Sequence, residues 1–297
     1  MSLRGEEQRE ELSSQYDTNI ANEEIYIMLN PNLFNTVFVI PILNLLVIFY
    51  KLFLFIRLPG AFGFAIIALT VAIRLLFQPF FQKQIETAKK MQEIKPQLDK
   101  LSAKHKNDQK QLQAEQLKLY QQYGINPTSG CLVMIIQLPI FIALYNTLNL
   151  FLLNGHAEKT ITAINKVLYF SVLKIETVNS WFFGLDLVKS PKVAGAWYYL
   201  LIPVITAALQ YFQAQASMPQ ANTSGPLVQA QKGNDKDDKK KEGGQGDFQK
   251  AMNTQMKYMF PLMIGWFSYS LPIGLALYWN IFSIMGIMQY KKVNDKK

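Results

Sequence analysis

The stretch "ALTVAIRLLFQPF", residues 68–80, contains one charged residue, Arg74, among apolar and uncharged side chains. Arginine stays charged in proteins, and its planar guanidinium pairs well with carboxylates. Thr70 lies four residues before Arg74 and Gln78 lies four residues after it, so on one continuous helix the three side chains share a face. The spacing therefore predicts a polar ridge of Thr70, Arg74 and Gln78 that could bind an acidic group.

Arg74 needs either a carboxylate partner or water, because an isolated charge in hydrocarbon is unfavourable. None of the apolar stretches of the chain contains an Asp or a Glu. Arg74 follows Phe62 by twelve positions, which is about 18 Å along a helix in a hydrocarbon core of about 30 Å. We therefore predict a water-filled groove around Arg74 that is open to the cytoplasm and closed on the other side.

Residues of the kinds that do enzymatic or metal chemistry are scarce. The two histidines, His105 and His156, lie in polar segments on opposite sides of the predicted membrane. The sequence contains no H-E-x-x-H, G-x-S-x-G or P-loop motif. Its one cysteine, Cys131, excludes an internal disulfide. We expect no catalytic residue, no metal and no cofactor.

The order of hydrophobic and polar residues indicates a membrane protein. Half of the 297 residues are hydrophobic, and they form long runs separated by very polar segments, which is typical of an integral all-α membrane protein. The net charge of +9 would also suit a nucleic-acid-binding protein. We disfavour that interpretation because the lysines lie between the apolar runs, where membrane topology alone would place them.

The apolar runs predict a core of five transmembrane helices within residues 58–290. The expected spans are about 60–81, 131–153, 197–213, 252–270 and 274–290, the last two joined by the turn "SLPIG". After the first span, residues 82–124 are polar, with apolar residues at three- and four-residue steps, and "KHKND" divides them into two halves. This pattern predicts an antiparallel helical hairpin outside the membrane.

Lysine counts predict the orientation of the chain. The hairpin 82–124 has nine lysines, the low-complexity linker 218–248 has five and the basic tail 291–297 has four, against five in residues 154–196. Cytoplasmic segments are enriched in Lys and Arg, so we expect the hairpin, the linker and the C-terminus in the cytoplasm. The composition of the linker predicts disorder.

The N-terminal part allows two topologies. Residues 1–32 form an acidic tail that we expect to be disordered. Residues 33–57 are apolar but carry Asn44 and Lys51 on one helix face, so they form either an interfacial helix or a further span. We favour the interfacial helix, with the N-terminus outside the cytoplasm, because the two-residue Pro-Gly turn that follows leaves little room between two spans. If the segment spans, the N-terminus is cytoplasmic.

Four segments resemble the motifs of the YidC family of membrane protein insertases, relatives of the mitochondrial and chloroplast insertases. They are, in chain order, "FGFAIIALTVAIRLLFQPF" (62–80), "NPTSGCLVMIIQLPIFIALYNTL" (126–148), "FFGLDL" (182–187) and "FPLMIGWFSYSLPIGLALYWNI" (260–281). The similarity runs, with gaps, from about residue 45 to residue 290. The resemblance implies a five-helix core, a cytoplasmic helical hairpin after the first core span, and a groove open to cytoplasm and lipid.

The resemblance also implies roles for individual residues. The groove arginine and threonine of the family fall on Arg74 and Thr70. The substrate-contacting residues of the family fall on Leu138, Phe141 and Trp279, and Tyr278 lies beside Trp279. A groove glutamine of the family falls on Gln210 or Gln213. For each uncharged polar residue, ordinary hydrogen bonding between helices is the alternative.

Together these features predict a membrane protein insertase of the bacterial plasma membrane that is not an enzyme. Its expected partners are nascent membrane proteins, the ribosome, the Sec translocon and the lipid bilayer, with no specific nucleic-acid sequence. The hairpin and the basic tail would recruit substrates or ribosomes, whose RNA is anionic. The rival function is a small-solute channel or transporter, which would require inverted repeats and paired intramembrane charges that the sequence lacks. A third alternative is a chaperone that holds partner helices during folding.

Overall fold

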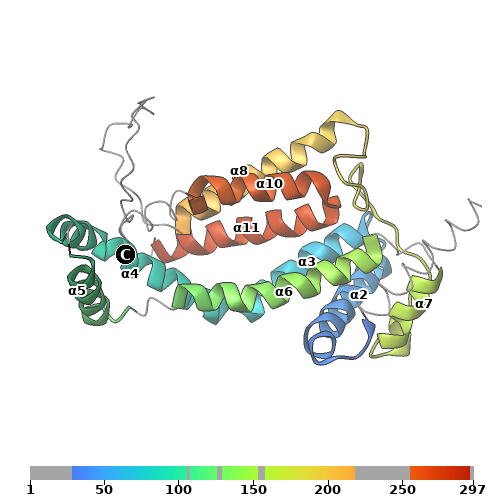
Figure 1. Ribbon diagram of the computed structural model, residues 1–297. Helices are drawn as coiled ribbons and strands as arrows, with labels where there is room; N and C mark the ends of the chain where they lie inside the picture. Colours follow the sequence, from blue (N-terminus) through green and yellow to red (C-terminus); the bar gives the residue numbers. More distant parts are fainter. Residues whose placement is uncertain (1–28, 106–107, 126–128, 153–157, 218–254, 295–297) are drawn as a thin grey trace, which may run out of the picture. The chain divides into compact units, whose positions relative to one another are not determined.

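The structure of the chain is a computed structural model (Figure 1). It describes residues 29–105, 108–125, 129–152, 158–217 and 255–294. Of the acidic tail predicted at 1–32, all but the last four residues lie outside this range. The linker predicted at 218–248 lies wholly outside it, as do the last three residues of the basic tail 291–297.

The described chain is mostly helical, as predicted, and each of the five predicted spans includes residues that are helical in the structure. In chain order the long helices are α2 (Ile40–Phe55), α3 (Ala61–Leu76), α4 (Gln78–Lys104), α5 (Gln109–Gln122), α6 (Ser129–Leu152), α7 (Glu158–Val167), α8 (Leu201–Ser217), α10 (Phe260–Ser270) and α11 (Ile273–Asn294). Short π- and 3-10-helical turns are η1 (Asn35–Val39), η2 (Ser171–Leu173), η3 (Trp197–Leu200) and η4 (Gln255–Met259). Strands β1 (Trp181–Phe182) and β2 (Leu185–Asp186) form an antiparallel hairpin that the all-α prediction did not include.

Glycine and proline residues mark several helix ends. Gly60, between α2 and α3, has a φ of +75°, a conformation that glycine adopts without steric cost. Pro79 is in the first turn of α4, where its missing N–H has no intrahelical partner to lose. Pro272 lies in the turn between α10 and α11 (Figure 1). These three residues therefore lie where helices begin or end, while Pro96 and Pro139 lie inside α4 and α6.

Two of the described helical stretches are each long and apolar enough to cross a membrane, namely Asn35–Phe55 and Ile273–Lys292. The neighbouring pair Ala61–Leu76 and Gln78–Lys104 passes the same test only when the two helices are counted together. The segment predicted as an interfacial helix, 33–57, therefore has the length and composition of a span, which is the alternative topology named above.

The chain divides into two compact units. The first comprises Met1–Leu76, Met134–Ile205 and Trp266–Phe282, and the second comprises Phe77–Val133, Thr206–Gly265 and Ser283–Lys297. In the first unit α2 packs against α3. Tyr50 of α2 meets Phe62 of α3 edge-on with ring centroids 5.8 Å apart, and Phe62 contacts Phe151 of α6 at 5.6 Å. Such ring pairs contribute about 0.5–1.5 kcal/mol beyond the burial of their surface.

Asn44 of α2 is buried and binds the chain that follows α7. Its Nδ2 donates to the carbonyl oxygens of Ile40 at 2.9 Å and of Val167 at 3.1 Å. Its Oδ1 accepts from the N–H of Tyr169 at 2.7 Å. The sequence suggested that Asn44 belonged to a polar face shared with Lys51. In the structure its amide instead satisfies backbone groups of the first unit.

We expect Asn44→Leu to lower the free energy of unfolding by about 1–3 kcal/mol, because it leaves the Tyr169 N–H and the Val167 carbonyl without their partner. Thr36→Val, a polar-to-apolar change at an exposed position of η1, serves as the control and should change stability by no more than about 0.5 kcal/mol. Thermal unfolding in detergent micelles measures both. Equal midpoints for the two variants would contradict a structural role of the Asn44 amide.

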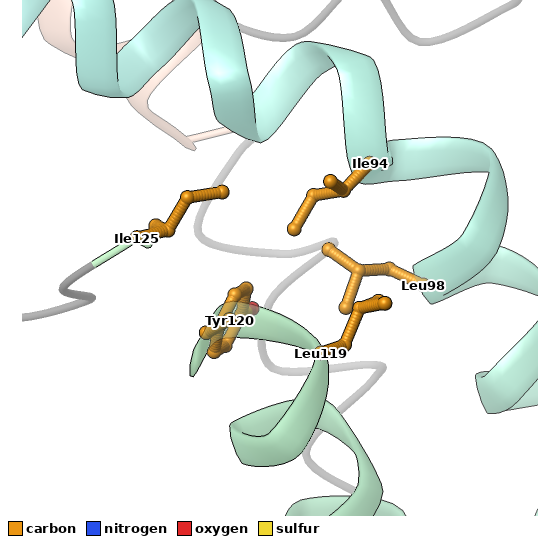
Figure 2. Close-up of a cluster of buried hydrophobic side chains, with 5 residues drawn as sticks. All are labelled: Ile94, Leu98, Leu119, Tyr120 and Ile125. Atoms are coloured by element: carbon orange, nitrogen blue, oxygen red, sulfur yellow. The ribbon is translucent and has the colours of Figure 1, made fainter. Parts of the chain in front are cut away.

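In the second unit α4 and α5 pack against each other through an apolar cluster. Figure 2 shows Ile94 and Leu98 of α4 pointing toward Leu119 and Tyr120 of α5, with Ile125 on the other side of the cluster. On α4, Ile94 and Leu98 together with the partly buried Met91 and Leu101 recur at three- and four-residue steps, which is the spacing that predicted an amphipathic helix there. The apolar face of each helix is therefore covered by the other.

Polar contacts join the neighbouring ends of α4 and α5. Asp108 caps α5, and its Oδ1 accepts from the N–H of Gln111 at 3.0 Å. His105, at the end of α4, is buried, and its Nε2 lies 3.1 Å from Oε2 of Glu115. These contacts hold the last residue before the connection, His105, and the first one after it, Asp108, against α5.

Candidate functional site

Arg74 lies in the last turn of α3 and is buried, with 3% of its surface exposed. A cation is favourable there because the C-terminal end of a helix carries partial negative charge. The guanidinium carbon lies 4.1 Å from the centroid of the Phe282 ring of α11. Such a cation–π contact contributes about 2 kcal/mol when it is desolvated. The helix end and the ring therefore both stabilise the buried charge of Arg74.

Thr70 lies one turn before Arg74 on α3 and is also buried. Its Oγ1 donates to the carbonyl oxygen of Ile66 at 2.7 Å. A hydroxyl has one proton to donate and keeps lone pairs that can accept. Toward any further group, Thr70 can therefore act only as an acceptor while this bond holds.

The helix that carries Thr70 and Arg74 ends before Gln78. α3 ends at Leu76, Phe77 leaves the helical conformation with a ψ of 11°, and Gln78 begins α4 in the other compact unit. The four-residue spacing places Gln78 beside Arg74 only on an unbroken helix, and that condition is not met. The groove position of Gln78 stays a prediction.

An aromatic pair from two helices forms the apolar part of the site. Phe141 of α6 and Trp279 of α11 stack with ring centroids 5.7 Å apart and an interplanar angle of 10°. Trp279 is buried and Phe141 is half-buried. On α6, Leu138 is 50% exposed and Ile142 is 45% exposed. Because they are four residues apart, they lie on one face of α6 and form an apolar strip next to the stacked rings.

Tyr278 differs from its neighbours in the predicted substrate-contacting set. It is fully buried, and its ring contacts that of Phe282 with centroids 5.9 Å apart. In this structure Tyr278 therefore supports the ring that lies under Arg74 and presents no surface of its own.

Gln210 of α8 makes a hydrogen bond between helices in the second unit. Its Nε2 donates to the Oγ of Ser283 on α11 at 2.9 Å, and both residues are buried. This is the structural role that the sequence left as the alternative. Gln213, one turn further on, is half-buried. Both glutamines belong to the second unit and Arg74 to the first, so their place beside Arg74 stays a prediction.

Within the described residues, no group of three or more His, Cys, Asp and Glu side chains could hold a metal ion. The apolar helices α2, α3, α6, α8, α10 and α11 contain no Asp or Glu at all. The arrangement of polar and apolar groups is therefore suited to binding, through one cation and an exposed apolar strip.

Sequence reasoning missed Phe282 and Ile142. Phe282 follows Tyr278 by four residues, so the helical repeat could have identified it as the next aromatic residue on that face. Ile142 follows the predicted Leu138 by the same interval. No local signal could have shown that the ring of Phe282 lies under Arg74, since 208 residues separate them (282 − 74).

Comparisons with known proteins match most of the chain. A family model described as "60Kd inner membrane protein" matches residues 54–297. Inner membrane ALBINO3-like protein 2 of the Chlamydomonas reinhardtii chloroplast is 32% identical over 240 residues, which cover 78% of this chain and 50% of that protein. Membrane protein insertase YidC of Oceanobacillus iheyensis is 30% identical over 281 residues, which cover 91% of this chain and 88% of that protein.

A third relative matches more closely over a shorter segment. Membrane protein insertase YidC of Caulobacter vibrioides is 45% identical over 117 residues, which cover 39% of this chain and 18% of that protein. The chain thus spans half the length of the chloroplast relative and most of the length of the Oceanobacillus one.

Proposed function

This chain belongs to the 60Kd inner membrane protein family, and from that premise we propose that it inserts newly made membrane proteins into a lipid bilayer. Two relatives described above carry the name membrane protein insertase. The observation that carries the proposal is Arg74, a permanent charge buried in a helix whose other residues are all uncharged. Such a charge is unfavourable in a membrane helix, and charged residues in membrane helices occur mainly at functional sites.

Arg74 attracts the polar flank of a substrate into a hydrated groove. A guanidinium attracts carboxylates, and it can bind one through two parallel hydrogen bonds. Thr70 adds an acceptor on the same face of α3. Gln78, Gln210 and Gln213 provide further polar lining of the groove. The short N-terminal flank of a nascent chain is held there transiently while its apolar segment moves.

The apolar strip on α6 receives the segment that will become a membrane helix. Leu138 and Ile142 supply exposed aliphatic surface, and Phe141 stacks on Trp279 behind them. Tyr278, beside Trp279, is buried and packs against the Phe282 ring. A contact between apolar surfaces is non-directional, so the segment can slide along the strip into lipid.

Hydrophobic partition supplies the free energy of insertion. A segment of about 20 apolar residues, each contributing about 0.3–0.6 kcal/mol on transfer, gains about 6–12 kcal/mol. This is enough to draw a short polar flank across without nucleotide hydrolysis. The chain accordingly acts as a binding surface and not as an enzyme.

The proposed topology has five core spans in the plasma membrane of a bacterium. The hairpin of α4 and α5 and the C-terminus then face the cytoplasm, as the lysine distribution indicates. There the hairpin and the basic tail recruit ribosomes, whose RNA is anionic, and the Sec translocon is a further proposed partner. The proposal therefore couples synthesis of a substrate to its entry into the groove.

Site-specific photo-crosslinking tests the contact between α6 and a substrate. We expect a photoreactive residue at position 138 to crosslink to a ribosome-stalled, single-span nascent chain, and to lose this crosslink when the chain is released. Position 52 is the matched control, because Leu52 of α2 is also a leucine in an apolar helix and is also 50% exposed. It should give little crosslink in either state.

Two results would count against the proposal. Equal crosslinking from positions 138 and 52 would indicate unspecific contact between apolar surfaces. A crosslink from position 138 that persists after release would indicate stable assembly with the substrate, as expected of a chaperone.

A further inference from the structure

The ring of Phe182 in β1 fills a notch that two glycines form at the start of α3. A Cβ atom placed on Gly63 would overlap the Phe182 ring, and one placed on Gly60 would lie 2.8 Å from its Cδ2 atom. Phe64 of α3 meets the same ring edge-on, with centroids 5.2 Å apart. Because a glycine has no side chain, the ring can lie directly against the backbone of the helix.

The turn of the β-hairpin determines which of its two phenylalanines enters the notch. Phe182 pairs with Leu185 across the hairpin, and the residues between them, Phe183 and Gly184, have φ values of 49° and 83°. Positive φ at both central residues is typical of a type I′ turn. Phe183 in this turn is 75% exposed and contacts the rings of Phe64 and Phe182, while Phe182 is the one that fills the notch.

Asp186 in β2 holds the base of the hairpin and joins it to α8. Its Oδ1 accepts from the hydroxyl of Ser180 at 2.8 Å and from the N–H of Val188 at 3.3 Å. Its own N–H donates to the hydroxyl of Tyr199 at 2.9 Å. Tyr199 lies in η3, which leads directly into α8, so the hairpin is fixed to the start of that helix.

Backbone hydrogen bonds fasten the chain after β2 to the region where α10 ends and α11 begins. They run from Gly274 N to Leu187 O at 3.0 Å, from Ile273 N to Lys189 O at 3.1 Å, and from Lys192 N to Tyr269 O at 3.1 Å. On the other side of the hairpin, the N–H of Asn179 donates to the Tyr50 hydroxyl of α2 at 3.3 Å. We call residues 179–192 the clasp, since they contact all these helices within the first unit.

The helix ends that the clasp joins belong to one end of the first unit: the starts of α3, α8 and α11 and the end of α10. Arg74 lies eleven residues beyond Gly63 on α3, which is about 16 Å along the helix. We propose that the clasp is the permeability seal of the proposed insertase, in which Phe182 on Gly63 closes the end remote from Arg74 to ions. This inference rests on the proposed function, because only a chain with a hydrated groove needs such a seal.

The packing of Phe182 has the properties that an ion barrier requires. A groove that admits water from the cytoplasm would conduct ions unless its far end were closed. The face of the Phe182 ring that lies on the backbone of Gly63 leaves no room for water there, while the rest of the ring is half-buried. The hydrogen bonds of the clasp keep the ring in place by joining the surrounding helix ends.

The test reconstitutes the full chain in phosphatidylethanolamine and phosphatidylglycerol vesicles and follows the decay of an imposed pH difference with a trapped dye. We expect Phe182→Ala to make the decay several-fold faster than in vesicles with the wild-type chain. Phe182→Leu, which keeps part of the side-chain volume, should give a smaller increase. Phe183→Ala is the matched control, because it removes the same kind of ring from an exposed position that contacts Phe182 and Phe64 without filling the notch, and it should leave the vesicles tight.

Insertion of a single-span substrate is measured in the same vesicles. The proposed seal is contradicted if Phe182→Ala elutes like the wild-type chain and the pH difference decays no faster in its vesicles than in those with Phe183→Ala. If Phe182→Ala does not fold, a Phe182→Leu variant as tight as Phe183→Ala overturns it in the same way. A wild-type chain that fails to insert the substrate would contradict the proposed function, and this outcome is independent of the leak comparison.

Discussion

Replacing Arg74 with alanine is expected to lower the insertion of single-span substrates with acidic N-terminal flanks by about ten- to a hundred-fold, which corresponds to about 1.5–3 kcal/mol for a lost charge-assisted hydrogen bond. The effect is at the upper end for a binding residue because a guanidinium can bind a carboxylate through two parallel, charge-assisted hydrogen bonds. The measurement is protease protection of a radiolabelled substrate in cells depleted of their own insertase and supplied with the variant.

Two further variants separate the charge of Arg74 from its place in the fold. Arg74→Lys keeps the charge but not the forked donor geometry, so it should restore most of the insertion that Arg74→Ala loses. Lys51→Ala is the matched control, because it removes another cation from an apolar helix, and Lys51 of α2 is half-buried. It should insert like the wild-type chain. Full activity of Arg74→Ala on acidic-flanked substrates would contradict the proposed role of the charge.

The largest change in stability is expected where Phe182 meets Gly63. Gly63→Val should lower the free energy of unfolding by about 1–3 kcal/mol through overpacking, and Phe182→Ala by about 3 kcal/mol through loss of a packed ring. The double variant should lose less than the sum of the two by about 1 kcal/mol or more, because the valine then occupies space that the ring has left. Unfolding by denaturing detergent, followed by circular dichroism, measures all three.

Ala68→Val provides the control for this size exchange. It also ends in a valine and adds two carbon atoms, one fewer than Gly63→Val, at a half-buried position of the same helix, and combined with Phe182→Ala it should give additive effects within about 0.5 kcal/mol. If the Gly63→Val and Phe182→Ala effects are also additive to this precision, the two residues do not share the notch that the structure indicates.

Features that depend on a single helix could be predicted from the sequence. Apolar length located the segments that became α6, α8, α10 and α11, and the three- and four-residue repeat located α4 and α5. The inference that Gln78 shares a face with Arg74 assumed one continuous helix, and the helix breaks at Phe77, so the place of Gln78 stays a prediction. Pro79 was the available signal, since proline favours the first turn of a new helix.

Features that join distant segments could not be predicted. Asn44 accepts a hydrogen bond from the backbone N–H of Tyr169, 125 residues away. The guanidinium of Arg74 lies over the ring of Phe282 in α11. The motif "FFGLDL" was recognised in the sequence, but its partner Gly63 was not. Periodicity describes one face of one helix and contains no information on which other face will cover it. Only the folded structure shows that the glycine and the phenylalanine require each other.

The apolar cluster between α4 and α5 has a consequence for the biogenesis of the chain itself. All five of its residues lie within positions 94–125, so its contacts close over short sequence separations, and such contacts form quickly. The helical pair can therefore fold as it leaves the ribosome, while the helices from α6 onward are still being synthesised. We expect it to reach its final form in water, before the spans from α6 onward have entered a membrane.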